Sequence, residues 1–292
     1  MISNGKFYES QFEEATIELL REAHWQYAFG DDIHRKYTDP LIEEDLRNFL
    51  AVQYKDKNLT TSEMDSIVAN LRNTGGQNDY YALRNTFLLY RDGYDFAYSD
   101  GRSNPFRLEY IDFEHPDHNI FRCVNQFVME QGRENRRPDI LLFINGIPVC
   151  IIELKNPTKQ NATIHDAHTQ ICTRYMRDIP ALLKYCALAV ISDGAKNALG
   201  ATYTPFEFFY EWKKIENEDK AGKGLDTLRT LIRGAISPER ILEILRDYVY
   251  FPDPTKEDDT TEIVCRYPQF FATRKLRDHI LNHLRSVGGD GK

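Results

Sequence analysis

The sequence predicts an α/β protein in which helices flank a central β-sheet. Two apolar runs within residues 137–157 flank an Asn-Gly pair, and each has the length and the β-branched residues of a buried strand. A further buried strand is predicted at 186–191. Segments 9–23 and 162–177 instead carry apolar residues at helical spacing. With 292 residues, 41% of them hydrophobic, the chain can bury a core in one large domain or two small ones.

Helices and strands are both predicted before the Asn-Gly pair. The helical segments are 9–23, 41–71 and the first part of 80–98, and the strands are 106–113 and 119–130. In the first helix, Ser10 could be the N-cap, with Glu13 completing a capping box three residues later. Residues 132–137 are predicted to form a basic loop.

The apolar runs around Asn145 and Gly146 are predicted to form a β-hairpin. Asn-Gly favours the positive φ angles of a tight turn. Pro148 has no N–H to donate to a neighbouring strand, so it is expected at the start of the second strand. In an antiparallel hairpin the start of the first strand lies beside the end of the second, so polar residues at these two places should meet.

Three charged residues occupy those two places. Asp139 opens the first strand, and Glu153 and Lys155 close the second, projecting from one face with Leu154 on the other. Carboxylates with open positions suit Mg²⁺, which keeps waters and accepts phosphate oxygens as ligands. A lysine beside such a metal can orient or activate the attacking water and stabilise charge on phosphorus. A hairpin ending in solvated charges is the alternative, but the combination of all these features favours the metal site.

More helices and strands are predicted after the hairpin. They are a helix at 162–177, a short helix at 181–184, strands at 186–191 and within 198–210, and helices at 225–235, from 238 onward and at 273–284. Ser237 and Pro238 predict an N-cap followed by the first helical position. A charged segment with glycines at 213–223 predicts an exposed link, so we divide the chain into residues 1–222 and a helical connector at 223–292.

Composition restricts the function less than the motifs do. The formal net charge of −8 does not indicate a nucleic-acid binder, although a local basic patch and a metal can bind DNA. The five cysteines include no Cys-x-x-Cys pair and indicate a reduced, cytoplasmic protein. We find no stretch as long as a membrane span and no signal peptide, so no membrane association is expected.

The residues around the hairpin resemble those of known nucleases. Pro138-Asp139, the hairpin and Glu153-Leu154-Lys155 are similar to the motif of PD-(D/E)xK nucleases. The wider sequence, densest from 121 to 194, resembles the N-terminal region of the type I restriction enzyme R subunit. The matching segments are Asn125-Gln126-Phe127, Asn145-Gly146-Ile147-Pro148 and Val190-Ile191-Ser192-Asp193-Gly194.

This resemblance implies a restriction-endonuclease-like fold, with a mixed β-sheet flanked by helices, and a Mg²⁺-dependent endonuclease of double-stranded DNA in which Mn²⁺ can substitute. Asp139, Glu153 and the main-chain carbonyl of Leu154 would hold the metal, and Lys155 would act on the water or the transition state. Glu13 matches the acidic residue that the first helix of this fold often adds to the metal site; the capping box is the alternative. The basic loop at 132–137 could hold the DNA backbone near the metal, or be solvated.

Gln170 and Tyr175 depart from the family pattern. The related nucleases carry Gln-x-x-x-Tyr on the helix after the hairpin, whereas these two residues are five apart. On an ideal α-helix a spacing of four separates two side chains by about 40°, and a spacing of five by about 140°. Either a π-bulge restores the geometry, or only one of the two residues acts.

The resemblance also places the chain in a larger assembly. The whole R subunit uses ATP to translocate DNA and works with modification (M) and specificity (S) subunits. Residues 288–292 look like a phosphate-binding loop but lack its spacing, so we expect a fragment that stops before the ATPase motor and does not bind ATP alone. Two other functions remain open: a nuclease-fold docking module that is inactive in isolation, and a standalone RecB-like repair nuclease.

Overall fold

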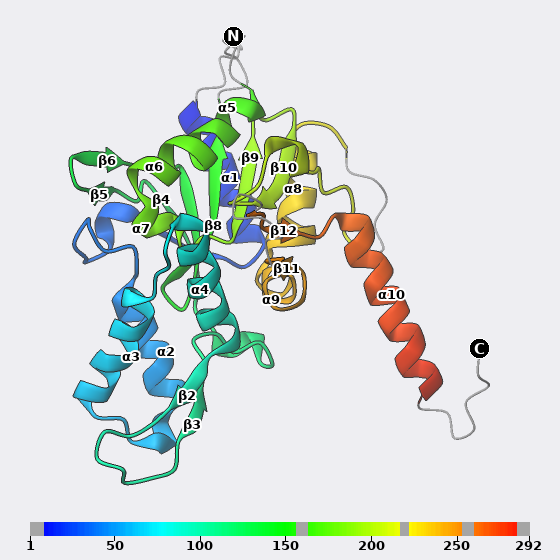
Figure 1. Cartoon of the computed structure of the whole chain (residues 1–292). Helices are drawn as coiled ribbons and strands as arrows, with labels where there is room; N and C mark the ends of the chain where they lie inside the picture. Colours follow the sequence, from blue (N-terminus) through cyan, green and yellow to red (C-terminus); the bar gives the residue numbers. More distant parts are fainter. Residues whose placement is uncertain (1–8, 156–162, 217–221, 253–259, 285–292) are drawn as a thin grey trace.

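The structure is a computed structural model that describes residues 9–155, 163–216, 222–252 and 260–284 (Figure 1). Several predictions concern residues outside these ranges. They are the phosphate-loop-like end at 288–292, residues 156 and 157 at the end of the hairpin segment, the first residue of the helix predicted at 162–177 and the middle of the link predicted at 213–223.

A six-stranded mixed sheet forms the centre of the molecule, in the order β1-β4-β7-β8-β9-β10. Its strands are β1 (Gln26–Phe29), β4 (Phe121–Asn125), β7 (Ile140–Ile144), β8 (Ile147–Leu154), β9 (Leu188–Ser192) and β10 (Asn197–Ala201). β1 runs parallel to β4 and β8 parallel to β9, whereas the other neighbours are antiparallel. The predicted α/β fold with a mixed sheet is therefore confirmed.

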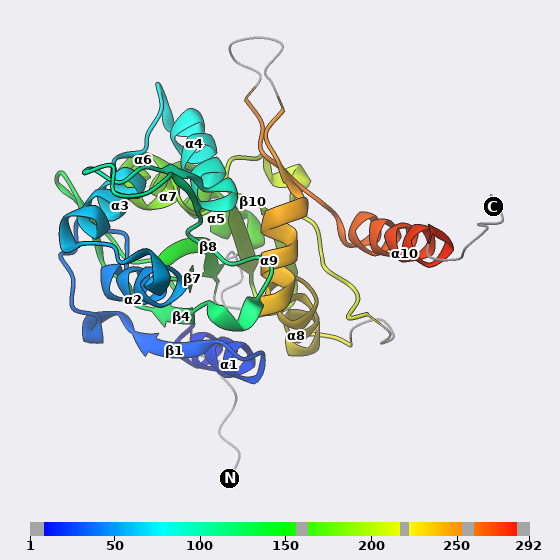
Figure 2. The ribbon, with the colours of Figure 1, turned by 90° about the horizontal axis from the view of Figure 1, so that it is seen from below.

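Helices cover both faces of this sheet (Figures 1 and 2). The α-helices of the described chain are α1 (Glu9–Glu22), α2 (Glu43–Gln53), α3 (Thr61–Asn73), α4 (Asp79–Asp92), α5 (Ile164–Thr169), α6 (Met176–Asp178), α7 (Pro180–Leu183), α8 (Leu225–Leu231), α9 (Pro238–Asp247) and α10 (Tyr267–Leu284), with π-helices at Gln170–Tyr175 and Ile232–Ile236. No helix within the described ranges is long and apolar enough to cross a membrane.

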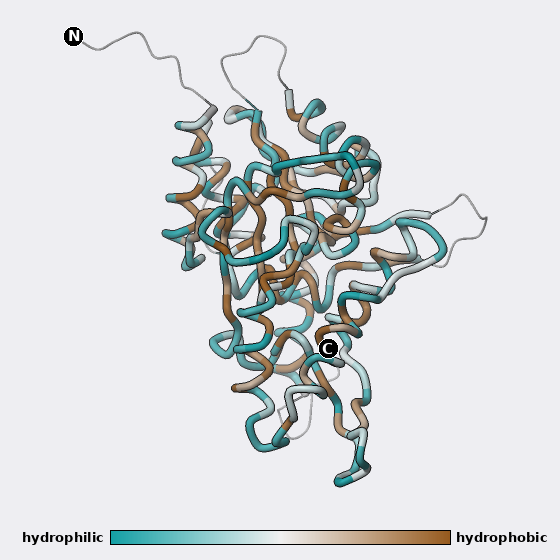
Figure 3. Tube along the Cα trace, turned by 90° about the vertical axis from the view of Figure 1, so that its left-hand side faces the viewer, coloured by the Kyte–Doolittle hydropathy of each residue, from teal (hydrophilic) through white to brown (hydrophobic). Residues whose placement is uncertain are grey.

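The core consists of two apolar clusters, one on each face of the sheet. Because side chains alternate along a strand, Leu141 and Phe143 of β7 join the cluster under α5 and α7, while Leu142 joins the cluster under α1, α4 and α9. Figure 3 shows hydrophobic residues along the interior strands and hydrophilic residues on the outer helices and loops. Each fully buried leucine or isoleucine contributes about 1.5–3 kcal/mol to stability.

Some predicted elements are shorter or divided. The strand predicted at 119–130 ends at Asn125, because Gln126 adopts a positive φ of 55° and redirects the chain. The basic loop predicted at 132–137 instead contributes a strand to one of three small hairpins, and the strand predicted at 106–113 ends at Leu108. These hairpins are β2 (Tyr94–Phe96) with β3 (Phe106–Leu108), β5 (Met129–Gln131) with β6 (Glu134–Arg136), and β11 (Val249–Tyr250) with β12 (Ile263–Val264).

The predicted β7–β8 hairpin is confirmed, and its turn is buried. Asn145 and Gly146 have φ angles of 50° and 75°. The Asn145 side chain is fully buried; its amide donates to the main-chain oxygen of Tyr110 at 2.9 Å, and its Oδ1 accepts from the Ile120 N–H at 2.8 Å. The oxygen of Gly146 accepts from the Ile42 N–H at 2.9 Å, so the turn lies against the chain that enters α2.

The residues after the predicted domain boundary pack against the N-terminal part of the chain. The Trp25 indole N–H donates to the main-chain oxygen of Ile236 at 2.8 Å, and both residues are buried in the same cluster. Ser237 and Pro238 start α9 as predicted. Phe270 near the start of α10 is buried in the same cluster, and the rest of the helix extends away from the body (Figures 1 and 2). The C-terminal helices thus exist as predicted, and the division at 222/223 stays a prediction.

Substituting Gly146 by alanine should destabilise the protein by at least about 2 kcal/mol. Alanine at this position would have to adopt the positive φ of Gly146, and its Cβ would lie 2.1 Å from the main-chain oxygen of Ile42. Gly132→Ala is the matched control, because Gly132 also has a positive φ but nothing lies within 4 Å of the added Cβ; it should cost about 1 kcal/mol. Urea denaturation measures both, and equal losses would contradict the role of the close contact.

Candidate active site

The β7–β8 hairpin brings the predicted acidic residues together at the end opposite its turn. Ile140 pairs with Ile152, so Asp139 lies beside the end of β8. Asp139 Oδ2 accepts a hydrogen bond from the Leu154 N–H at 2.7 Å. This bond fixes the Asp139 carboxylate next to the Glu153–Leu154 peptide, as the predicted geometry of the hairpin requires.

Glu153 and Lys155 meet on one face of the sheet, and Leu154 belongs to the core on the other face. Lys155 Nζ lies 2.8 Å from Glu153 Oε1 and donates to Gln170 Oε1 at 2.7 Å. The Gln170 amide also donates to Glu153 Oε1. The four predicted residues Asp139, Glu153, Lys155 and Gln170 therefore form one polar cluster at the end of apolar strands.

The Glu153 carboxylate is almost completely buried, with 1% of the residue exposed. Burial and, to a smaller extent, the nearby charge of Asp139 together raise the pKa of Glu153 to about 8, although the ammonium of Lys155 acts in the opposite direction. Burial outweighs the single ion pair here because a desolvated carboxylate loses most of its hydration. Glu153 Oε2 is buried without a hydrogen-bond partner among the described residues.

A π-helix brings Gln170 and Tyr175 together. The chain from Gln170 to Tyr175 forms π-helical turns between α5 and α6. The Gln170 amide donates to the Tyr175 hydroxyl at 2.7 Å, although the two residues are five apart. Of the two alternatives left open by the sequence, the structure contains the π-helical one. Burial raises the pKa of Tyr175 far above its usual value, so the hydroxyl keeps its proton.

Glu13 lies on α1 near, but not within, this polar cluster. Its Oε1 accepts from the Asn125 amide at 2.7 Å and from the Gln126 amide at 2.9 Å. The Gln126 N–H in turn donates to the main-chain oxygen of Asp139 at 3.3 Å. α1 already includes Glu9, so Ser10 is not its N-cap and the predicted capping box is wrong. Whether Glu13 binds metal stays a prediction.

Asn125 and Gln126 connect Glu13 to the hairpin, a role that their family resemblance did not predict. A local signal was available, because these two amides interrupt the apolar run of β4. The positive φ of Gln126 turns its side chain toward α1 instead of continuing the strand. An Asn-Gln pair at the end of a buried strand can therefore indicate hydrogen-bond donors to an acidic side chain.

Part of the basic segment before Asp139 is paired with acids. Arg136 Nε donates to Asp178 Oδ2 at 2.8 Å, and Arg136 Nη2 donates to Glu134 Oε2 at 2.6 Å. Arg133 and Arg137 are exposed. Arg136 therefore stabilises the β5–β6 hairpin against α6. Arg133 and Arg137 remain accessible, as the predicted contact with a DNA backbone requires.

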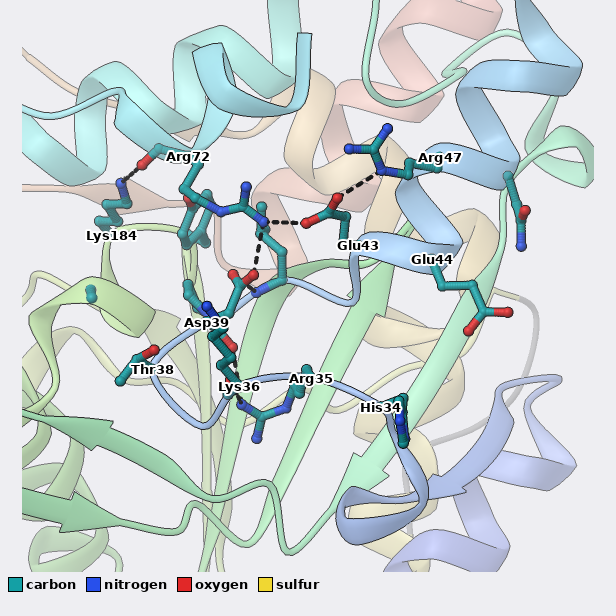
Figure 4. A pocket seen from close by; sticks show the side chains of 15 residues that line it. His34, Arg35, Lys36, Thr38, Asp39, Glu43, Glu44, Arg47, Arg72 and Lys184 are labelled. Atoms are coloured by element: carbon teal, nitrogen blue, oxygen red, sulfur yellow. Dashed lines mark hydrogen bonds and ion pairs between the residues drawn. The ribbon is translucent and has the colours of Figure 1, made fainter. Parts of the chain in front are cut away.

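A cavity of about 830 Å³ lies elsewhere, between the segment that precedes α2, the end of α3 and α7 (Figure 4). Arg72 Nη2 lies 2.8 Å from Asp39 Oδ2 and 2.6 Å from Glu43 Oε2, and Lys184 Nζ donates to the Arg72 main-chain oxygen at 2.7 Å. None of the predicted site residues lines this cavity. Its internally paired charges argue against a bare phosphate-binding surface.

The hairpin end fits a divalent metal by its donor set. Two carboxylates, Asp139 and Glu153, approach one another, and the Glu153 Oε2 atom lacks a hydrogen-bond partner among the described residues. A buried, unpaired carboxylate oxygen is costly unless a cation or a proton compensates it. Oxygen ligands of this kind suit Mg²⁺ and Mn²⁺. Metal binding stays a prediction here.

Glu153→Gln should change how stability depends on pH in the absence of divalent metal. Between pH 4.5, near the unfolded pKa, and pH 8, the folded protein holds a proton on Glu153 that the unfolded chain has lost. The parent should therefore lose stability as pH rises through this window, by a few kcal/mol at about 1.4 kcal/mol per pKa unit. The variant should lack the part of this loss that Glu153 causes and keep the part from Glu262, another buried carboxyl group whose pKa is raised by burial.

Urea denaturation at pH 5, 7 and 9 tests this prediction for the parent and the variant. Glu130→Gln is the matched control, because Glu130 is exposed and its loss should leave the parent's pH dependence unchanged. Parallel pH profiles for the parent and Glu153→Gln would show that Glu153 is not held protonated in the folded protein.

Comparison with known proteins identifies the family. Residues 6–208 match the model of the type I restriction enzyme R protein N terminus. The type I restriction enzyme HindI endonuclease subunit of Haemophilus influenzae is 29% identical over 92% of this chain and 26% of its own length. The putative type I restriction enzyme MjaIXP endonuclease subunit of Methanocaldococcus jannaschii is 27% identical over 92% of this chain and 27% of its own length.

This chain thus spans about a quarter of the length of these relatives. The family match covers well over half of the chain, including all six strands of the sheet and every predicted site residue. The chain therefore belongs to the family of type I restriction enzyme R protein N-terminal regions.

Proposed function

We propose that this chain is the Mg²⁺-dependent endonuclease part of a type I restriction R subunit and that it hydrolyses phosphodiester bonds of double-stranded DNA. The observation that supports this most is the buried Glu153 carboxylate beside Lys155, at the end of the hairpin where Asp139 is also fixed. Its relatives are named as endonuclease subunits. The PD-(D/E)xK resemblance of the same residues supports the chemistry.

Asp139, Glu153 and the main-chain carbonyl of Leu154 would hold Mg²⁺, with Mn²⁺ as a substitute. A bound Mg²⁺ would lower the pKa of a water and neutralise charge on the phosphate. Two features of the sheet support this assignment, because Asp139 is bonded to the Leu154 N–H and Glu153 is buried. Little rearrangement of the chain is then needed for ligand binding.

Lys155 is the residue we assign to the attacking water or the developing phosphate charge. Its ammonium has three N–H donors, and the described residues accept from two of them, through Glu153 and Gln170. These two bonds fix the direction of the ammonium, which strengthens its electrostatic effect on a reacting group. Tyr175 would assist through its neighbours, because its hydroxyl accepts from the Gln170 amide and also bonds with Glu153.

A whole R subunit is proposed to add ATP-driven DNA translocation and to assemble with M and S subunits. In that arrangement the M and S subunits would choose the DNA and the motor would deliver it. This chain would then have weak or no activity on duplex DNA by itself. A docking module without its own active site is the competing function, and metal binding separates the two.

Calorimetric titration with Mg²⁺ and Mn²⁺ tests the metal site directly. We expect saturable binding by the parent and at least a tenfold loss of affinity in Asp139→Ala and Glu153→Ala, because each removes a carboxylate ligand. Asp95→Ala is the control, since Asp95 is exposed on the β2–β3 hairpin. Equal binding by all four proteins, or binding by none, would favour the docking module.

Cleavage of duplex DNA by the assembled restriction complex tests the roles of Lys155 and Tyr175. Lys155→Ala should lower the rate about 100-fold or more, the usual effect of removing a preorganised charge donor. Tyr175→Phe should lower it about tenfold, because the Gln170 amide loses its hydroxyl acceptor while the buried ring remains. ATP-dependent translocation should be unchanged in both. Cleavage by Lys155→Ala at the parental rate would remove Lys155 from the mechanism.

A further inference from the structure

We infer that Asp112, His115 and His118 form a second metal site, for Zn²⁺, in the segment between β3 and β4. Within the described ranges they are the one group of three His, Cys, Asp or Glu residues whose possible metal-binding atoms all lie within 4.8 Å of one another. The site is distinct from the proposed Mg²⁺ site, because it shares no residue with Asp139, Glu153 or their hydrogen-bond partners.

Two of the distances within this group are close to those between ligands that share one ion. Asp112 Oδ2 lies 2.9 Å from His118 Nδ1 and 3.3 Å from His115 Nδ1. Two ligand atoms at about 2.0–2.1 Å from a tetrahedral Zn²⁺ lie about 3.3 Å from each other. The two imidazole rings stack with their centroids 4.8 Å apart and an interplanar angle of 21°, so both Nδ1 atoms reach the carboxylate from neighbouring positions.

Three nitrogen groups gather around the Asp112 Oδ2 atom. The Gln53 amide donates to it at 3.0 Å, and the Nδ1 atoms of both imidazoles lie within 3.3 Å of it. One carboxylate oxygen offers about two lone pairs, so it cannot accept a well-aligned bond from all three groups. An ion between the oxygen and the two imidazole nitrogens would replace both imidazole contacts and leave the Gln53 bond in place.

The carboxylate is held ready for an ion by the main chain. Asp112 Oδ1 accepts from the N–H groups of Glu114 and His115, at 3.0 and 2.9 Å. The Asp112 side chain is only 5% exposed, whereas those of His115 and His118 are 64% and 47% exposed. A fixed, buried acid with two accessible imidazoles leaves a side open for entry of the ion and for a water as the fourth ligand.

The donor set selects the class of metal. Two imidazole nitrogens and one carboxylate oxygen suit Zn²⁺ and similar transition ions, whereas Mg²⁺ prefers oxygen ligands only. The two sites of this protein would therefore take different ions. Zn²⁺ would also stabilise the buried turn of the hairpin, because the Asn119 Oδ1 atom accepts from both the Asp112 N–H, at 2.9 Å, and the Asn145 amide, at 2.8 Å.

Co²⁺ absorption and Zn²⁺ competition on the whole chain test this inference. The parent should bind one equivalent of Co²⁺ with the visible bands of a tetrahedral site, and Zn²⁺ should displace it and raise the melting temperature. His115→Gln and His118→Gln should each weaken binding at least tenfold and abolish the rise. Circular dichroism without metal confirms folding; His115, the more exposed of the two, keeps the test valid should His118→Gln not fold.

Two control variants separate this site from other metal binding. His279→Gln removes one member of a second histidine pair, on α10, whose rings lie 4.0 Å apart; it should keep the one-equivalent Co²⁺ site. Glu153→Ala removes the proposed Mg²⁺ ligand and should keep it as well. Absence of saturable binding in the parent, unchanged binding in both His115→Gln and His118→Gln, or loss of binding only in a control variant would each overturn the inference.

Discussion

The buried amide of Asn145 sets the register of the β7–β8 hairpin, and the rest of the site depends on that register. Its hydrogen bonds with Tyr110 and Ile120 hold the turn against the chain that enters β4. A slip of one residue would move every side chain of β8 to the opposite face of the sheet. Glu153 would then point into the wrong core cluster, away from Gln170. The chemistry at one end of the hairpin thus depends on a polar side chain at the other end.

Burial of the proposed active site makes the charged Glu153 carboxylate costly for stability and strengthens the attraction of the site for a cation. The strands around Glu153 are apolar and closed to solvent, so its deprotonated form is stabilised mainly by Lys155 and the Gln170 amide. Surroundings of low dielectric strengthen every charge interaction that remains. A divalent ion therefore has more to gain there than at an exposed pair of acids. Sites that sacrifice stability in this way are typical of function.

The sequence was most informative where a local rule and the global fold agree. Asn-Gly between two apolar runs predicted the hairpin, and the positions of Asp139, Glu153 and Lys155 followed from it. β1 was missed although Trp25, Tyr27 and Phe29 alternate along the chain, because the strand has only four residues and three of them are exposed. The π-helix at Gln170 could be posed only as an alternative, because the stability of π-helical turns depends on the contacts of Tyr175 with Gln170 and the core. Tertiary contacts of this kind are absent from local periodicity.

The hydrogen bond between Trp25 and Ile236 has a consequence for how the protein is made. The two residues are 211 positions apart, and the main core cluster contains side chains from both regions. A ribosome releases the N-terminal helix and the first strand long before Ile236 exists. The apolar face of the sheet that these helices cover therefore stays exposed until the C-terminal helices have been synthesised. Maturation of this nuclease fold is expected to be late and to require protection of the nascent chain from aggregation.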